Sequence, residues 1–246
     1  MKIELNWLDE VGSTSTWLAS NLTSDMESGY IVAARSQTAG RGQRGNGWEA
    51  EPGKNLSFSL LLRPDGIEAR RQFFISQAVA LGITDALRHL LPGHEVLIKW
   101  PNDIYVGNRK ICGILIENSL AGQRIAHSIA GIGINVNQEQ FLSDAPNPVS
   151  VIQLTGKSTE LEPLLRKVVD NIGVYMKLDA ATVHKLYIGS LWGRRGTHYR
   201  ETATGRTFVA DITGIGPMGH MTLTATDGTI VEYAFKEVAV ILPETL

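Results

Sequence analysis

A long apolar segment with short β-like runs on both sides constrains the fold most. Residues 71–91 are largely apolar and stop at Pro92-Gly93, which predicts one buried helix. Compact apolar runs at 3–8, 56–62, 95–100, 110–117 and 125–136 predict strands, with Gly107-Asn108 and Ala121-Gly122 as turns. Strands interrupted by a helix predict a mixed α/β fold, in which the helix packs on a sheet.

The rest of the chain predicts more helices and then a second, smaller unit. A hydroxyl cluster at Ser13 favours a helix start, and the spacing of apolar residues predicts helices over 160–178 and 181–191. Beyond about residue 193 the pattern changes to short strands, predicted at 207–212, 220–225, 229–234 and 238–242. We therefore predict a larger domain over 1–192 and a small β-barrel or sandwich over 193–246.

Charge and composition exclude several classes of protein. The 246 residues carry a net charge of -2, so no global positive field attracts the chain to nucleic acid or to an anionic membrane. A single cysteine, Cys112, excludes an internal disulfide and a cysteine-based zinc site. The sequence has neither a secretory signal nor a long uncharged apolar run, so we expect a soluble, cytoplasmic protein.

The glycine-rich and arginine-containing segment 37–48 is the strongest candidate for chemistry. Gly40 and Gly42 leave backbone amides unshielded, Arg41 and Arg44 add fixed positive charge, and Trp48 offers a flat face to a purine. This combination suits a phosphate or an adenylate, and the alternative is a solvated surface loop. The Gly-x-Gly-x-x-Gly pattern within it lacks the helix that a dinucleotide fold requires.

Two further glycine motifs carry no predicted chemistry. The stretch 214–219 repeats the same glycine pattern between two predicted strands, with a proline inside it, and is interpreted as a hairpin turn. The stretch 155–158 resembles the end of a phosphate loop, but Val151 stands where the first glycine belongs.

Charged residues at the ends of predicted strands are the second candidate. Lys99 precedes Asn102 and Asp103 at a proline corner, and Lys110 opens an otherwise apolar strand, where an unpaired ammonium is costly. A regular strand would place Lys110, Cys112 and Ile114 on one face and Gly113 on the other. Cys112 is interpreted as a buried filler rather than a nucleophile. Taken alone, the segment 99–103 is as compatible with a structural role, in which Lys99 snorkels to solvent and Asn102-Asp103 form a turn, as with a functional one.

The order and spacing of these segments resembles the biotin protein ligases. The resemblance spans about residues 8–137 and rests on 12–15, 37–48, 53–57, 99–103, 109–117 and 131–135. It implies an α/β (α+β) fold: the class II aminoacyl-tRNA synthetase-like catalytic domain of the biotin/lipoate ligases, with a small C-terminal SH3-like β-barrel. The implied reaction joins biotin to AMP with ATP and Mg²⁺, and then transfers biotin to a lysine of a biotin carboxyl carrier protein.

The resemblance also assigns roles to residues. It implies a biotin site formed by Ser13, Thr14, Ser15, Gln37, Arg41, Gly42, Gln43, Lys110 and Gly113. It implies an adenylate site formed by Arg41, Arg44, Trp48, Lys99, Asn102 and Asn135, with Lys110, Arg41 and Asp103 as catalytic residues and Asp103 as a magnesium ligand. Because arginines are frequent in the family where Gln43 and Asn46 stand, retention of the intermediate is expected to depend more on Arg41 and Arg44.

The resemblance also bears on domain content, and it leaves two alternatives for the function. The ligase pattern begins within about ten residues of Met1, so we expect a monofunctional ligase without the N-terminal DNA-binding domain of bifunctional members, and no DNA partner. A lipoate or octanoate ligase is the alternative enzyme, and a non-catalytic RNA-binding module is the alternative without catalysis. The sequence does not discriminate between a monomer and a homodimer.

Overall fold

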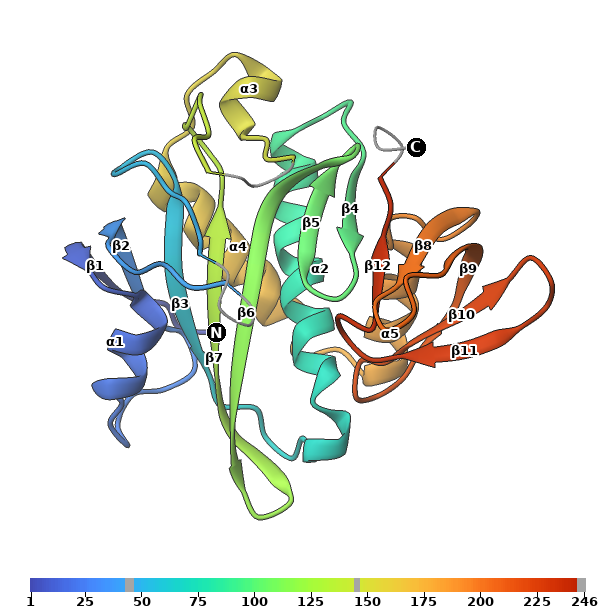
Figure 1. Ribbon diagram of the computed structural model, residues 1–246. Coiled ribbons are helices and arrows are strands. Elements are labelled where there is room, and N and C mark those ends of the chain that lie inside the picture. Colours follow the sequence, from blue (N-terminus) through green and yellow to red (C-terminus); the bar gives the residue numbers. More distant parts are fainter. Residues whose placement is uncertain (43–46, 144–146, 243–246) are drawn as a thin grey trace.

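Two β sheets and the helices that cover them make up the protein (Figure 1). The computed structural model describes residues 1–42, 47–143 and 147–242. The larger sheet has seven strands in the order β1-β2-β3-β7-β6-β5-β4; β1 and β2 run parallel, and the other neighbouring strands run antiparallel. In sheet order these strands are Glu4–Val11, Tyr30–Gln37, Leu56–Leu62, Arg124–Ile134, Arg109–Ala121, Asp103–Val106 and Val96–Lys99.

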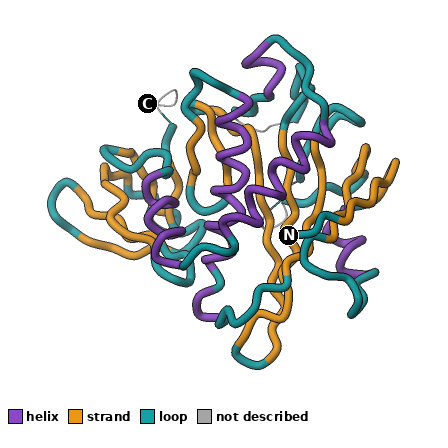
Figure 2. The backbone as a smooth tube through the Cα atoms, turned by 180° about the vertical axis from the view of Figure 1, so that it is seen from behind, coloured by secondary structure: helices purple, strands orange, loops and turns teal. Residues whose placement is uncertain are grey.

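The alternation of side chains in β3 separates the two faces of this sheet. Leu56, Phe58 and Leu60 belong to the main core under α2 (Phe73–Leu90) and α4 (Leu161–Tyr175), whereas Leu61 packs in a small cluster with Leu18 of α1 (Thr14–Ser20). Seen from behind, the long helices cross the sheet (Figure 2). A Cβ on Gly82 of α2 would lie 2.6 Å from Ile172 of α4, so this glycine permits their close approach. The opposite face is therefore left to α1 and the loops.

The smaller sheet follows α5 (Ala180–Gly189) and is antiparallel, as predicted for the C-terminal region. Its strands are ordered β11-β10-β9-β8-β12, with bounds Ile230–Tyr233, Met221–Ala225, Thr207–Ile215, Thr197–Glu201 and Val238–Val240. Trp100 Nε1 donates to the Gly219 carbonyl at 2.9 Å, which ties this sheet to the larger one. Buried residues of both sheets form one continuous core, so the boundary at 192/193 stays a prediction.

Most predicted elements lie where the sequence placed them, and the segment 214–219 does connect two antiparallel strands. The prediction missed β2, β5, β8 and the short helix α3 (Val151–Thr155). Gln37, the first residue of the glycine-rich segment 37–48, is the last residue of β2, because pairing with β1 extends that strand to Gln37. Gly156, with φ of 67°, ends α3, so residues 155–158 lie at a helix C-terminus. A phosphate loop instead presents backbone amides at a helix N-terminus.

A bulge in β6 contradicts the predicted arrangement of Lys110 and Gly113. Ile104 pairs with Cys112 but Tyr105 pairs with Lys110, so Ile111 is an extra residue and alternation is interrupted. A Cβ on Gly113 would lie 3.3 Å from Lys110 Nζ, so Lys110 and Gly113 share a face. Cys112 is instead fully buried in the core under the helices. The lysine is thereby turned toward the face that the helices leave open.

Among residues 1–42, 47–143 and 147–242, no helix combines the length and apolar character that a membrane crossing requires.

Candidate active site

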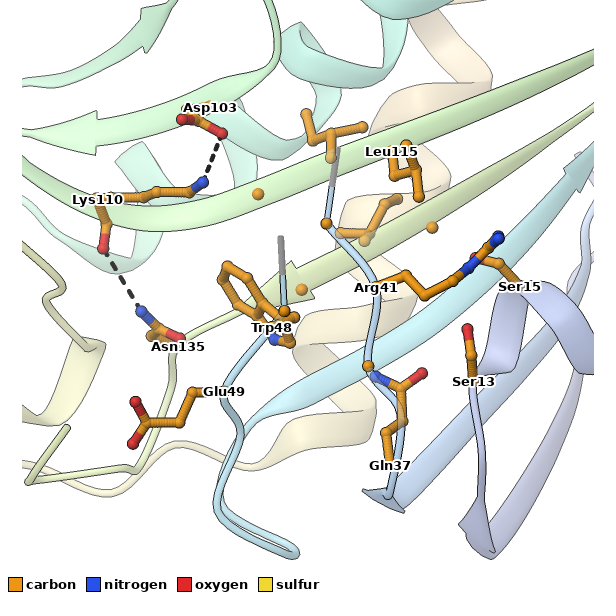
Figure 3. Close-up of a pocket in the computed structure, with 18 of the residues that line it drawn as sticks. Ser13, Ser15, Gln37, Arg41, Trp48, Glu49, Asp103, Lys110, Leu115 and Asn135 are labelled. Atoms are coloured by element: carbon orange, nitrogen blue, oxygen red, sulfur yellow. Dashed lines mark hydrogen bonds and ion pairs between the residues drawn. The ribbon is translucent and has the colours of Figure 1, made fainter. Parts of the chain in front are cut away.

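A cavity of about 810 Å³ opens on the sheet face that carries α1. Most of the predicted site residues line it, namely Ser13, Thr14, Ser15, Gln37, Arg41, Gly42, Trp48, Asn102, Asp103, Lys110, Gly113 and Asn135. Figure 3 shows the hydroxyl and amide side chains at one end, the Lys110–Asp103 pair at the other, and Arg41 and Trp48 between them. The volume is typical of small-molecule sites.

Glycines in β6 and β7 form the floor of the cavity. Gly113 of β6 pairs with Gly133 of β7, and Gly131 lies two residues before Gly133 in β7. A Cβ on Gly133 would lie 2.3 Å from the Trp48 indole, and one on Gly131 would lie 2.5 Å from Ser15 Oγ. Side chains here would fill the space that the indole and the hydroxyl occupy, so the glycines let both rest directly on the sheet.

A chain of buried hydrogen bonds fixes the polar end. The Thr14 backbone N–H and hydroxyl donate to Gln37 Oε1 at 2.8 and 3.2 Å. Ser59 Oγ lies 2.8 Å from Thr14 Oγ1 and 2.9 Å from Ser15 Oγ. Because the Thr14 proton is used on Gln37, we infer that Ser59 donates to Thr14 and accepts from Ser15. Because the Ser15 hydroxyl proton is used inward, its oxygen offers only acceptor capacity to a ligand. This end of the cavity therefore suits a ligand with N–H donors.

Two cationic side chains line the cavity, Arg41 nearer to Ser15 and Lys110 nearer to Asn135 (Figure 3). Lys110 Nζ is 2.7 Å from Asp103 Oδ1 and 5.8 Å from the centroid of the Trp48 ring, with both partners of the ion pair mostly shielded from solvent. Arg41 Nη2 donates to Glu117 Oε2 at 2.5 Å, in a pair that is more than two-fifths exposed. An exposed pair contributes about 0–1 kcal/mol, so an incoming anion can displace Glu117 at little cost.

Buried polar atoms without partners mark the far end. Asn135 Nδ2 donates to the Val149 carbonyl at 3.1 Å, which leaves Asn135 Oδ1 buried and unpartnered among the described residues. Trp48 Nε1 is likewise buried without an acceptor in that set. An unpaired buried polar atom costs free energy, so a bound ligand could be stabilised by donating to Asn135 Oδ1 and accepting from Trp48 Nε1.

The remaining predicted residues behave differently. Lys99 does not line the cavity: it pairs with Asp103 across β4 and β5, and its ammonium lies 5.3 Å from the Tyr105 ring centroid. Burial lowers the pKa of this lysine. Its role in ordering phosphates stays a prediction, and Gln43 and Arg44 lie outside the described residues. Burial raises the pKa of the Cys112 thiol, consistent with a structural role.

Several residues in the cavity wall or directly behind it were not predicted. Ser59 was overlooked within an apolar run, although the alternation of residues 56–60 places both serines of that run opposite the leucines. Glu49, Phe141 and Ser143 line the cavity from loops, and Phe235 reaches it from the small sheet. No local sequence pattern marks these four, because their position depends on long-range packing.

Residues that could hold a metal are few. No group of three or more His, Cys, Asp or Glu side chains that could bind a metal ion occurs in the part of the chain that the structure describes. Asp103, which is paired with Lys110, offers a carboxylate in the cavity lining. Magnesium is commonly bound by one or two carboxylates together with substrate phosphates, so Asp103 fits an ion that arrives with a nucleotide.

Known proteins share this architecture over nearly the whole chain. The biotin protein ligase of Aquifex aeolicus, solved in complex with biotin and ATP, superimposes with a TM-score of 0.79 at 26% identity, covering 96% of this chain and 98% of that one. The fold is thus the mixed α/β fold of the biotin protein ligases. The description "Biotin/lipoate A/B protein ligase family" belongs to the family model that matches residues 7–135.

Curated relatives agree with the structural match. The bifunctional ligase/repressor BirA of Bacillus subtilis is 32% identical over 237 residues, which cover 90% of this chain and 68% of the relative. The biotin–[acetyl-CoA-carboxylase] ligase of Paracoccus denitrificans is 33% identical over 192 residues, covering 75% of this chain and 78% of the relative. The chain therefore belongs to the biotin/lipoate A/B protein ligase family.

Proposed function

We propose that this protein is a biotin protein ligase, which converts biotin and ATP to biotinyl-5′-AMP and transfers the biotinyl group to a lysine of a biotin carboxyl carrier protein. One observation carries the proposal: a single cavity joins a polar end, with the Ser15 oxygen and the Gln37 amide, to cations at Arg41 and Lys110, and then to the unpartnered Asn135 oxygen. A ring with N–H groups, a carboxylate and an adenine match these three environments in that order.

The polar end would select biotin by its ureido ring. The directed chain through Thr14 and Ser59 leaves the Ser15 oxygen as an acceptor for a ureido N–H. Ser13, whose side chain makes no cap hydrogen bond to the α1 backbone, lines the same end and can meet the ureido oxygen. Gln37, with its oxygen occupied by Thr14, has its amide nitrogen available. The apolar tail of biotin would then follow the glycine floor toward the cations.

The cations would promote both steps of the reaction. The biotin carboxylate attacks the α-phosphorus of ATP, a mixed anhydride forms, and pyrophosphate leaves. The amine of the carrier lysine then attacks the anhydride carbonyl, and AMP leaves. Negative charge develops on oxygen in each step, and Lys110, held in place by Asp103, is oriented in advance to stabilise it. Arg41 would exchange Glu117 for the carboxylate and the α-phosphate.

Adenine and magnesium would occupy the other end. Asn135 Oδ1 can accept from the adenine amine, and the Trp48 indole offers a face for stacking. Asp103 would hold Mg²⁺ together with the phosphates. The ion would neutralise charge on the departing pyrophosphate.

Lipoate or octanoate is the alternative substrate, because the matching family model covers biotin and lipoate ligases together. An acyl chain without a ureido ring has no N–H to donate to the Ser15 oxygen, so the acceptor capacity of this buried hydroxyl would go unused and biotin is favoured.

Mass spectrometry of a carrier domain tests the proposal. The protein is incubated with ATP, Mg²⁺ and either biotin, lipoate or octanoate, together with a biotin carboxyl carrier domain or a lipoyl domain. We expect a biotinyl mass increment on the biotin carrier alone. Modification of the lipoyl domain instead, or pyrophosphate release that does not depend on biotin, would overturn the assignment.

A further inference from the structure

A network of hydrogen bonds joins the loop after Trp48 to the loop after β7. The buried Gln138 amide accepts from the Glu51 backbone N–H at 2.9 Å and from Asn55 Nδ2, and it donates to the Gln140 carbonyl at 2.8 Å. Its Nε2 also donates to Glu49 Oε1 at 3.0 Å. These bonds fasten the bases of the two loops together beside the cavity.

Glu49 extends this network to the tip of the second loop. Its Oε1 accepts from the Leu142 backbone N–H and its Oε2 from the Ser143 backbone N–H, both at 2.8 Å. Residues 141 and 143 line the cavity, as Glu49 and Trp48 do. The carboxylate of Glu49 thus links the segment that follows Trp48 to residues 142 and 143 of the loop after β7.

Apart from a hydrogen bond that Gln153 Nε2 donates to the Glu139 carbonyl at 2.7 Å, residues 139–143 have few contacts among the described parts of the chain. Glu139, Gln140 and Ser143 are exposed. Leu142 is 89% exposed, so burial of its side chain contributes little, although its backbone N–H is bound by Glu49. Only Phe141 is partly buried. With so little apolar contact, the position of Phe141 at the cavity depends chiefly on the hydrogen bonds that Glu49 accepts.

We propose that Glu49 is a positioning residue for the nucleotide, holding residues 141–143 so that Phe141 and Trp48 form opposite walls of the adenine end. This inference rests on the proposed function, since it assigns the nucleotide to that end. Glu49 need not touch ATP: it acts through the loop, and the separation of KM from kcat distinguishes this role from a general loss of structure.

Glu49→Gln tests the inference, with Glu51→Gln as its matched control. In Glu49→Gln the amide oxygen can still accept one hydrogen bond, but its NH₂ group would face a backbone N–H. The exposed Glu51 side chain, two residues away, makes no hydrogen bond or ion pair with the residues that the structure describes, and Glu51→Gln removes the same charge. We expect the KM for ATP to rise about tenfold in Glu49→Gln, the change equivalent to about one charge-assisted hydrogen bond. The kcat and the KM for biotin should stay within about twofold of wild type, as should all constants of Glu51→Gln.

Two further measurements keep the inference separable from the proposed function. Titration calorimetry with α,β-methylene-ATP, alone and with biotin, should show the same tenfold weakening and needs no turnover. Phe141→Ala should weaken binding similarly, and the double variant should be no worse than Phe141→Ala, because Glu49 acts through that ring. Additive effects, or an unchanged nucleotide affinity in Glu49→Gln, would overturn the inference even if biotin transfer is normal. If the wild-type protein transfers no biotin but Glu49→Gln still weakens nucleotide binding, only the proposed function would be overturned.

Discussion

Replacing Gly133 with alanine should damage nucleotide binding by displacing Trp48. The new methyl carbon would lie 2.3 Å from Trp48 Cε2 and 2.6 Å from Cζ2 and Nε1. Non-bonded carbons rest at about 3.5–4.0 Å, so the indole must withdraw by roughly 1 Å. The strand cannot yield instead, because Gly133 is paired with Ser57 on one side and Gly113 on the other. Overpacking of this kind costs about 1–3 kcal/mol, or about fivefold to a hundredfold in an equilibrium constant.

Biotin-dependent ATP–pyrophosphate exchange measures the effect. We expect the KM for ATP to rise at least about fivefold in Gly133→Ala. Gly113→Ala should have a smaller effect, because its Cβ would lie 3.0 Å from the indole and 3.3 Å from the Lys110 side chain. Gly189→Ala in α5, with nothing within 4 Å, is the control for the substitution itself. A wild-type KM in Gly133→Ala, or an equal shift in Gly189→Ala, would refute the packing argument.

Three other substitutions probe the cavity and the hydroxyl chain behind it. Lys110→Ala and Arg41→Ala should each abolish the exchange, and near-normal exchange in either variant would contradict the assignment of the site. Arg41→Ala should have the melting temperature of wild type, because the ion pair between Arg41 and Glu117 is exposed. Ser59→Ala should raise the KM for biotin about fivefold and leave the KM for ATP unchanged, because roughly 1 kcal/mol is lost when the hydroxyl chain is broken; an unchanged KM for biotin would exclude a directing role for Ser59.

Local patterns predicted the strands and helices that depend on their own apolar residues. β3 begins and ends as expected because its leucines are buried, and α2 ends where Pro92-Gly93 requires. The ordered motifs likewise identified most of the cavity wall. Each of these signals is carried by residues close together in the chain, so neighbours along the sequence suffice to detect it.

The rest depended on contacts between distant segments. The bulge at Ile111 turns Lys110 toward the cavity, and no residue in that apolar run indicates where alternation is interrupted. Ser59 acquires its role only when α1 brings Thr14 and Ser15 against it. Strand pairing places Lys99 one strand beyond Asp103 and outside the cavity lining, a position that its motif does not indicate; its phosphate contact stays a prediction.

Glu49 also makes the pH dependence of stability testable. Burial by itself raises the pKa of this carboxyl, but the hydrogen bonds from Ser143, Leu142 and Gln138 together lower it below its ordinary value of 4.5. A carboxyl with a lowered pKa in the folded state contributes stability above about pH 4.5, and this contribution is lost as the pH falls through the lowered pKa. Urea denaturation of wild type and Glu49→Gln, from about pH 7 to about pH 3, should therefore show the largest difference near neutrality and convergence in acid. Other carboxyls with lowered pKa values, such as Asp179 and Glu201, are common to both proteins and cancel in the difference. A difference that does not change with pH would mean that the Glu49 charge has no part in holding the loop.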